Sequence, residues 1–293
     1  MKYLILYLGI LLSLFTSCTE RIDIDTTNSD PVLVIYGCIT NELTYQKVEV
    51  SRSSPYFDDQ PNQGISGAKV TISSSSGDEI WQMEESKSDK GQYLTILPVA
   101  ANASERYTLK VEYDFNNDGT DEVYEAVTTV QQPFEIDSAK INSLNIIGRH
   151  QYSFNIYGQD SSEKDFYVCK FLVNDSLVSS SISQYILFDD KIINGAYLNG
   201  LMITSFADVK EKADYGDDIP DYLFFVESGD KITIEISRVE KGYYDFIMQC
   251  QQGIDGENPF FGGPPSNIDT NITTGAVGYF SSFSPTKFTV TVP

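Results

Sequence analysis

The sequence contains one histidine, one tryptophan and few basic residues, with 20 lysines and arginines against 42 aspartates and glutamates. A single histidine excludes the HExxH zinc motif, and a Ser-His-Asp triad would have to use His150, which no G-x-S-x-G elbow accompanies. We expect His150 to be an exposed loop residue beside the start of a strand. These absences favour a non-catalytic protein. A glycoside hydrolase with two carboxylates stays an alternative, because spacing in sequence does not reveal spacing in space.

The excess of acidic residues gives a formal net charge of −22. Proteins that bind nucleic acids draw much of their affinity from basic patches, so we expect no nucleic-acid partner. An acidic surface would also be repelled by anionic lipid headgroups, but it attracts divalent cations.

Cysteine is scarce: the four residues are Cys18, Cys38, Cys169 and Cys250, without a CxxC pair or a metal-ligand spacing. The last three lie in apolar stretches, which predicts small buried side chains. A disulfide between Cys169 and Cys250 is the alternative.

Long apolar runs are missing except for one, LILYLGILLSLF at residues 4–15, which follows Lys2 and is too short to span a bilayer comfortably. Thr16 and Ser17 follow, and then Cys18. A small residue before cysteine is typical of bacterial lipoprotein signals. We therefore predict a signal peptide at 1–17, a lipid on Cys18 that anchors the protein to a membrane, and a polar tether at 18–29. Simple secretory cleavage, with Cys18 incidental, is the alternative.

Short strand-like runs separated by Gly, Pro, Asn, Asp and Ser fill the rest of the chain, which predicts an all-β protein of two β-sandwiches. Gln131-Gln132-Pro133 forms a natural boundary, so the expected domains are 30–132 and 133–293. One stretch differs: Tyr243, Phe246, Ile247 and Cys250 recur at helical spacing. We predict one short helix near 241–252, with Gly253 as its C-cap, and a long loop at 254–275.

The sharpest local motif is DFNNDGTDEVYE, which begins at Asp114. Asp114, Asn116 and Asp118 have the spacing of calcium ligands, and Gly119 permits a sharp bend. The flanking segments read as strands rather than helices, so we do not expect an EF-hand. Either the segment is a plain hairpin turn, or it is a calcium loop whose ligands are Asp114, Asn116, Asp118 and Asp121.

Two aromatic pairs, Tyr56-Phe57 and Phe260-Phe261, lie in Pro-, Gly- and Asp-rich segments that predict loops. Exposed aromatic side chains in such loops bind protein partners or stack on sugars. The alternative is that they fold back and fill the loops. Trp81 is expected in the core or at a sheet edge.

Three stretches together carry a family resemblance: PVLVIYGCITNE after the signal, VEVSRSSPYFDDQPNQGISGAKVTI, and SNIDTNITTGAVGYFSSFSPTKFTVTVP at the carboxyl end. They resemble the domain-of-unknown-function family numbered 4249, outer-membrane lipoproteins of the Bacteroidota. The first domain, with its GAKVTI and GQY runs, is similar to carboxypeptidase-regulatory-like and transthyretin-like sandwiches, and we expect both domains to be sandwiches of the immunoglobulin-like or transthyretin-like kind. The family has no agreed catalytic residues.

Members of this family often accompany TonB-dependent outer-membrane transporters. The resemblance therefore implies a surface-exposed lipoprotein that serves such a transporter as an accessory or ligand-capturing partner. An independent surface module that binds a glycan, a peptide or a protein is the alternative.

Overall fold

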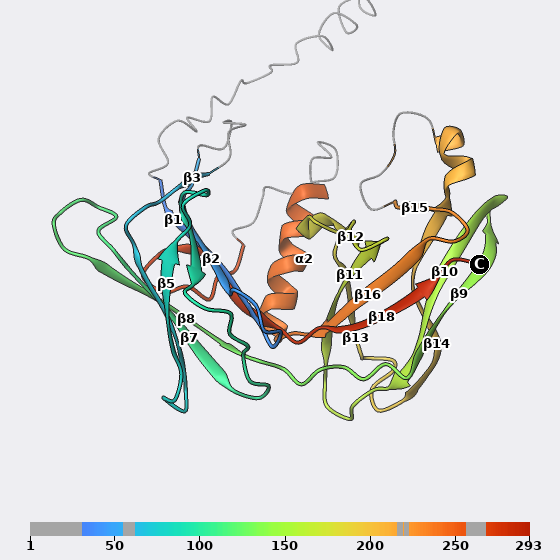
Figure 1. Ribbon diagram of the computed structural model, residues 1–293, viewed down its shortest axis with the longest axis horizontal. Coiled ribbons are helices and arrows are strands. Elements are labelled where there is room, and N and C mark those ends of the chain that lie inside the picture. Colours follow the sequence, from blue (N-terminus) through green and yellow to red (C-terminus); the bar gives the residue numbers. More distant parts are fainter. Residues whose placement is uncertain (1–30, 55–61, 216–218, 220–222, 256–267) are drawn as a thin grey trace, which may run out of the picture.

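The computed structural model describes residues 31–54, 62–215, 219, 223–255 and 268–293. Over these residues the chain is an all-β protein in two halves that lie side by side, with an α-helix between them (Figure 1). The predicted fold class is therefore confirmed. No helix within these residues is long and apolar enough to cross a membrane.

The first half is a nine-stranded sheet wrapped around its own core. Its strands alternate buried and more exposed side chains, as in β1 (Leu33–Thr40), because one face of the sheet packs inward. Trp81 belongs to this core, where its ring stacks on Tyr107 at 5.0 Å. The strands that follow β1 are β2 (Lys47–Arg52), β3 (Gln63–Gly64), β4 (Lys69–Ser74), β5 (Ile80–Glu85), β6 (Gln92–Thr95), β7 (Arg106–Tyr113) and β8 (Glu122–Thr129).

The ninth strand of this sheet is β17 (Val277–Phe283), which comes from the carboxyl end of the chain and pairs in parallel with β1. The assignment of all residues from 133 to 293 to a second sandwich is therefore wrong for β17. A parallel pair between chain ends leaves no local signal, because its two partners are joined by the whole intervening chain. Gly278 permits the pairing: its φ is +110°, and a Cβ there would lie 2.0 Å from the Ile35 carbonyl oxygen.

The second half is a sandwich of two sheets. One sheet contains β9 (Ser138–Ile146), β10 (Arg149–Gln159), β14 (Tyr197–Asp208) and β15 (Phe225–Val226), in the order β15-β14-β10-β9. Phe171 of the other sheet packs edge-on against Phe154 and Phe206 of the first, with ring centroids 5.7 and 5.4 Å apart. The other sheet is built from β11 (Phe166–Val173), β12 (Ser176–Leu177), β13 (Ile186–Asp189), β16 (Lys231–Arg238) and β18 (Thr286–Thr291).

The predicted helix is present as α2 (Lys241–Asp255), between the two halves in Figure 1. It continues through Gly253, so the prediction that Gly253 is the C-cap is wrong. The helix contacts both halves: the Tyr243 hydroxyl hydrogen-bonds Tyr36 of β1 at 2.8 Å, and the Tyr244 ring packs 5.1 Å from Phe166 of β11. The apolar stripe read from the sequence is thus buried at the junction. Residues 256–267 of the predicted loop lie outside the described residues.

Cys38, Cys169 and Cys250 are free thiols, so the disulfide alternative is wrong. Cys169 is buried, as predicted, whereas the other two are half-buried. Burial raises the pKa of the Cys38 thiol to about 11, which keeps it protonated and unreactive at neutral pH.

Candidate functional site

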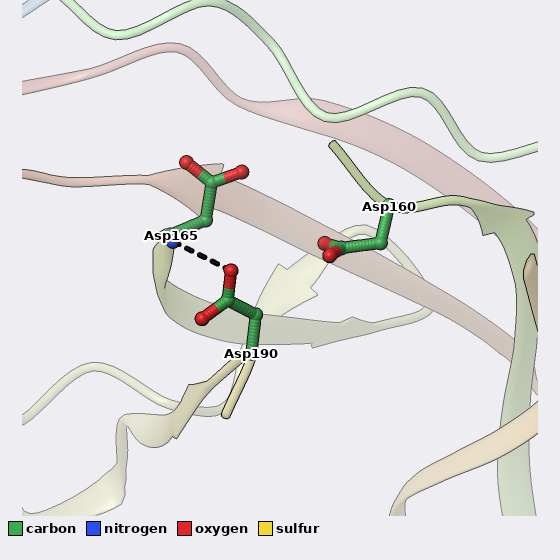
Figure 2. Close-up of side chains that lie close together, drawn as sticks. All are labelled: Asp160, Asp165 and Asp190. Atoms are coloured by element: carbon green, nitrogen blue, oxygen red, sulfur yellow. Dashed lines mark hydrogen bonds between the residues drawn. The ribbon is translucent and has the colours of Figure 1, made fainter. Parts of the chain in front are cut away.

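Three aspartates from different strand ends meet near the junction of the two halves. Asp160 follows β10, Asp165 precedes β11 and Asp190 follows β13. One carboxylate oxygen from each lies within 4.8 Å of the others, and Figure 2 shows the three side chains around a common space. Within the described residues, this is the group of acidic, histidine or cysteine side chains that comes closest to a metal-ligand arrangement.

Hydrogen bonds hold each carboxylate in place. Asp160 accepts from the Tyr167 hydroxyl at 2.5 Å and from the Gly195 amide at 3.1 Å. Asp165 accepts from the Ser161 hydroxyl at 2.7 Å, while its own amide donates to Oδ2 of Asp190 at 2.8 Å. The cluster thus ties together the segments at 160–165 and 190–195. Burial, reinforced by the bond to Asp160, raises the pKa of Tyr167 far above its usual value, so Tyr167 remains a hydrogen-bond donor.

The cluster carries more negative than positive charge. Arg238 supplies one guanidinium, whose Nε lies 3.1 Å from Oδ2 of Asp165, and both side chains are largely buried. Asp190 is fully buried, and its Oδ1 has no hydrogen-bond partner among the described residues. Burying a carboxylate oxygen that accepts no hydrogen bond costs free energy. A group that donates a hydrogen bond would therefore be more stable than an acceptor next to Oδ1 of Asp190.

The three aspartates do not provide a complete set of ligands for a divalent cation. Calcium takes six to eight oxygen ligands, whereas both oxygens of Asp160 and one of Asp190 already accept hydrogen bonds. Arg238 would also repel a cation next to Asp165. The residues present therefore fit a cluster of hydrogen-bonded carboxylates with one guanidinium ion pair better than a metal centre.

Asp165 and Arg238 also line a polar pocket of about 440 Å³. Residues of the first half form one wall and residues of the second half form the other, so the pocket opens at the junction. Except for Val130, every lining residue carries a hydroxyl, amide or charged group. The other lining residues are Ser104, Thr129, Val130, Gln131, Gln132, Ser161, Ser162 and Glu163.

The candidate calcium residues lie in the turn between β7 and β8. Oδ1 and Oδ2 of Asp114 accept from the amides of Asp118 and Gly119 at 3.1 and 2.9 Å. Asn116 and Asp118 accept from amides two residues ahead, each at 2.8 Å. Asp121 instead pairs with Lys69 at 2.8 Å, and hydrogen bonding to Asp121 raises the pKa of Lys69.

This geometry favours the hairpin-turn interpretation, because the oxygens expected to bind calcium hold the turn's own amides. The calcium interpretation stays a prediction for experiment. The other candidate residues, Cys18, Tyr56, Phe57, Phe260 and Phe261, lie outside the described residues.

Sequence reasoning missed the aspartate cluster and misplaced His150. The three aspartates follow no motif, and Asp190 comes 25 residues after Asp165; their one local signal is a position at the end of a strand. His150 lies within β10 rather than in a loop, and its side chain is about one-third exposed. Its ring hydrogen-bonds Ser143 and Asp208.

The fold and this geometry describe an all-β protein in two halves with a polar pocket at their junction. Residues 19–289 match the family described as "Domain of unknown function (DUF4249)", and the chain belongs to this family. The resemblance found in the sequence is thereby confirmed. The family description assigns no activity.

No curated protein matches the chain. Among solved structures, it is similar to the "Crystal structure of chicken CNTN1 FN1-FN3 domains", with 11% identity and a TM-score of 0.29. The match covers 71% of this chain and 60% of that one.

Proposed function

We propose that the protein is a lipoprotein of the outer membrane that captures a polar ligand, without catalysis at the capture site, for a TonB-dependent transporter. Two features of the sequence support the location: the apolar run ends at Thr16-Ser17-Cys18, and a short polar segment then precedes the first strand. A lipid on Cys18 would leave the two halves free to move over a membrane protein.

The observation that carries the capture role is the pocket between the two halves. Hydroxyl and amide groups suit a ligand rich in hydroxyls, and Arg238 beside Asp165 and Glu163 offers both signs of charge. A volume of about 440 Å³ is in the range of small-molecule sites. A monosaccharide to disaccharide or a short peptide therefore fits the chemistry of the lining.

A second candidate is an independent surface module that binds another protein. It is favoured by four large apolar side chains that project to solvent from two neighbouring segments: Leu43 (76% exposed), Tyr45 (53%), Ile96 (53%) and Leu97 (68%). The segments are held together by reciprocal backbone hydrogen bonds between Thr44 and Val99 at 3.2 and 2.9 Å. Exposed apolar groups gathered in this way mark interaction surfaces.

Purification of the tagged full-length protein from membranes in mild detergent, followed by mass spectrometry, separates these functions. The proposal predicts that a TonB-dependent transporter co-purifies with the wild type and is lost with Cys18→Ala. Co-purification of an unrelated surface protein that Leu97→Glu abolishes would support the second candidate. Elution of the protein alone would overturn the transporter proposal.

A further inference from the structure

His150 connects an exposed hydroxyl to a buried carboxylate. Its Nε2 lies 2.7 Å from Oγ of Ser143, and its Nδ1 lies 3.0 Å from Oδ2 of Asp208. Ser143 is exposed, the His150 side chain is 35% exposed, and the Asp208 side chain is only 7% exposed. The order from solvent to interior is therefore serine, histidine, aspartate, and both distances are within the range for a nucleophile, its base and the group that orients the base.

The β-strands explain why these three residues meet. β9 and β10 form an antiparallel hairpin in which Ser143 pairs with Tyr152 and Asn145 pairs with His150. Ser143 and His150 are thus diagonal neighbours on one face, close enough for side-chain contact. On the other side of β10, Ala207 of β14 pairs with Gln151, which places the next residue, Asp208, beside His150.

Asp208 also determines which nitrogen of His150 carries the proton. The Lys210 amide donates to its Oδ1 at 2.9 Å, and this bond, together with His150, holds the pKa of the Asp208 carboxyl below its usual value. An ionised carboxylate only accepts hydrogen bonds, so Nδ1 of His150 must donate to it. In the neutral imidazole, Nε2 then has a lone pair that can accept from the Ser143 hydroxyl. The Tyr152 ring packs edge-on against the imidazole at 4.7 Å and restricts its rotation.

We propose that Ser143 is an activated nucleophile that accepts acyl groups from carboxylic esters, with His150 as its base and Asp208 as the positioning residue. This adds a catalytic activity to the proposed capture role, and the two sites are separate, because Ser143 of β9 is not among the residues that line the pocket. The Ser143 oxygen bonds to the ester carbonyl carbon while its proton passes to Nε2 of His150. The tetrahedral adduct expels the alcohol, which takes that proton, and acyl-Ser143 remains. Water, with His150 again as base, can then release the carboxylic acid.

The surroundings of Ser143 suggest a slow reaction with an acyl-enzyme that can be trapped. β9 lies at the end of its sheet and pairs only with β10 among the described strands. The open edge of such a strand carries unpaired main-chain N–H groups. These groups and solvent water can both donate hydrogen bonds to the oxyanion of the tetrahedral adduct. Ser143 lies on an exposed stretch of β9, so small esters are the expected substrates.

Covalent labelling of the full-length protein with a fluorophosphonate probe and acylation by p-nitrophenyl acetate test the proposal. Peptide mapping should locate both modifications on Ser143, and Ser143→Ala should abolish them. Asp208→Asn should slow labelling at least about 10-fold, and Asp208→Glu should restore part of the rate, because the carboxylate acts only through His150. Ser176→Ala, which removes another exposed serine, should change nothing.

A thiol at the same position provides an independent measurement. Ser143→Cys should react with iodoacetamide at neutral pH at least about 10-fold faster than Ser176→Cys, and His150→Gln should remove that difference. Peptide mapping separates this reaction from those of the native cysteines. Labelling that is absent, or equal in wild type and Ser143→Ala, would overturn the proposal, as would equal alkylation rates at positions 143 and 176.

Discussion

The chain has two acidic regions that differ in both sequence and structure. The turn at Asp114–Asp121 has the spacing of calcium ligands, yet its carboxylates bind the turn's own amides or Lys69. Asp160, Asp165 and Asp190 have no motif, yet their oxygens approach within 4.8 Å in a buried site. The comparison shows that a ligand-like spacing within a turn does not leave its carboxylates free to bind a cation. Strand pairing, in contrast, brings carboxylates from separate segments together in space.

The largest effect should come from Arg238, the one cation that pairs with the buried cluster in the described part of the chain. Replacing it with methionine, Arg238→Met, should lower the free energy of unfolding by about 3 kcal/mol, because Asp165 is left with an uncompensated charge. Urea denaturation measures the change. Lys191→Met, which breaks the exposed pair with Asp189, is the matched control and should have little effect. Equal losses in the two variants would show that the buried region is no more sensitive than the surface.

A smaller effect is expected in the turn between β7 and β8. Asp114→Ala should lower the free energy of unfolding by about 1.5 kcal/mol, because two amides lose their acceptor. The hairpin-turn interpretation predicts the same loss in calcium and in chelator. Asp78→Ala, which changes an aspartate in the turn between β4 and β5, is the control. A wild-type melting midpoint that falls on chelation, with no such fall for Asp114→Ala, would establish the calcium interpretation instead.

The smallest change tests the charge balance of the cluster itself. Asp190→Asn should raise the free energy of unfolding by about 1 kcal/mol, because one of three neighbouring negative charges is removed while the side chain keeps its shape. Asp78→Asn should leave stability unchanged. If Asp190→Asn were instead destabilising, and only in the presence of calcium, the three aspartates would be cation ligands.

Local patterns predicted much of the fold. The alternation in LVIYGCIT predicts β1, and the stripe of Tyr243, Phe246 and Ile247 predicts α2, because each pattern depends only on the period of its own element. The pairing of β17 with β1 was missed because nothing near residue 277 identifies its partner. Gly278 was visible in the sequence, but its role in the close approach to Ile35 emerges only with the two strands side by side.

The candidate sites show the same limit. The three aspartates of the cluster meet because β11 pairs with β13 and β10 ends nearby. No short stretch of sequence reveals either arrangement. His150 was expected in a loop beside the start of a strand. The turn that precedes it is so tight that the strand resumes at once: Ile147 and Gly148 both have positive φ, and Arg149 already pairs with Ile146.

The account depends most on the covalent attachment of a lipid at Cys18, since both surface roles require the anchor. Cells that express the wild type or Cys18→Ala can be grown with radiolabelled palmitate, and the protein recovered by its tag. We predict a labelled wild-type protein in the membrane fraction and an unlabelled variant. An unlabelled wild-type protein in the soluble fraction would contradict the proposed location and the transporter role with it.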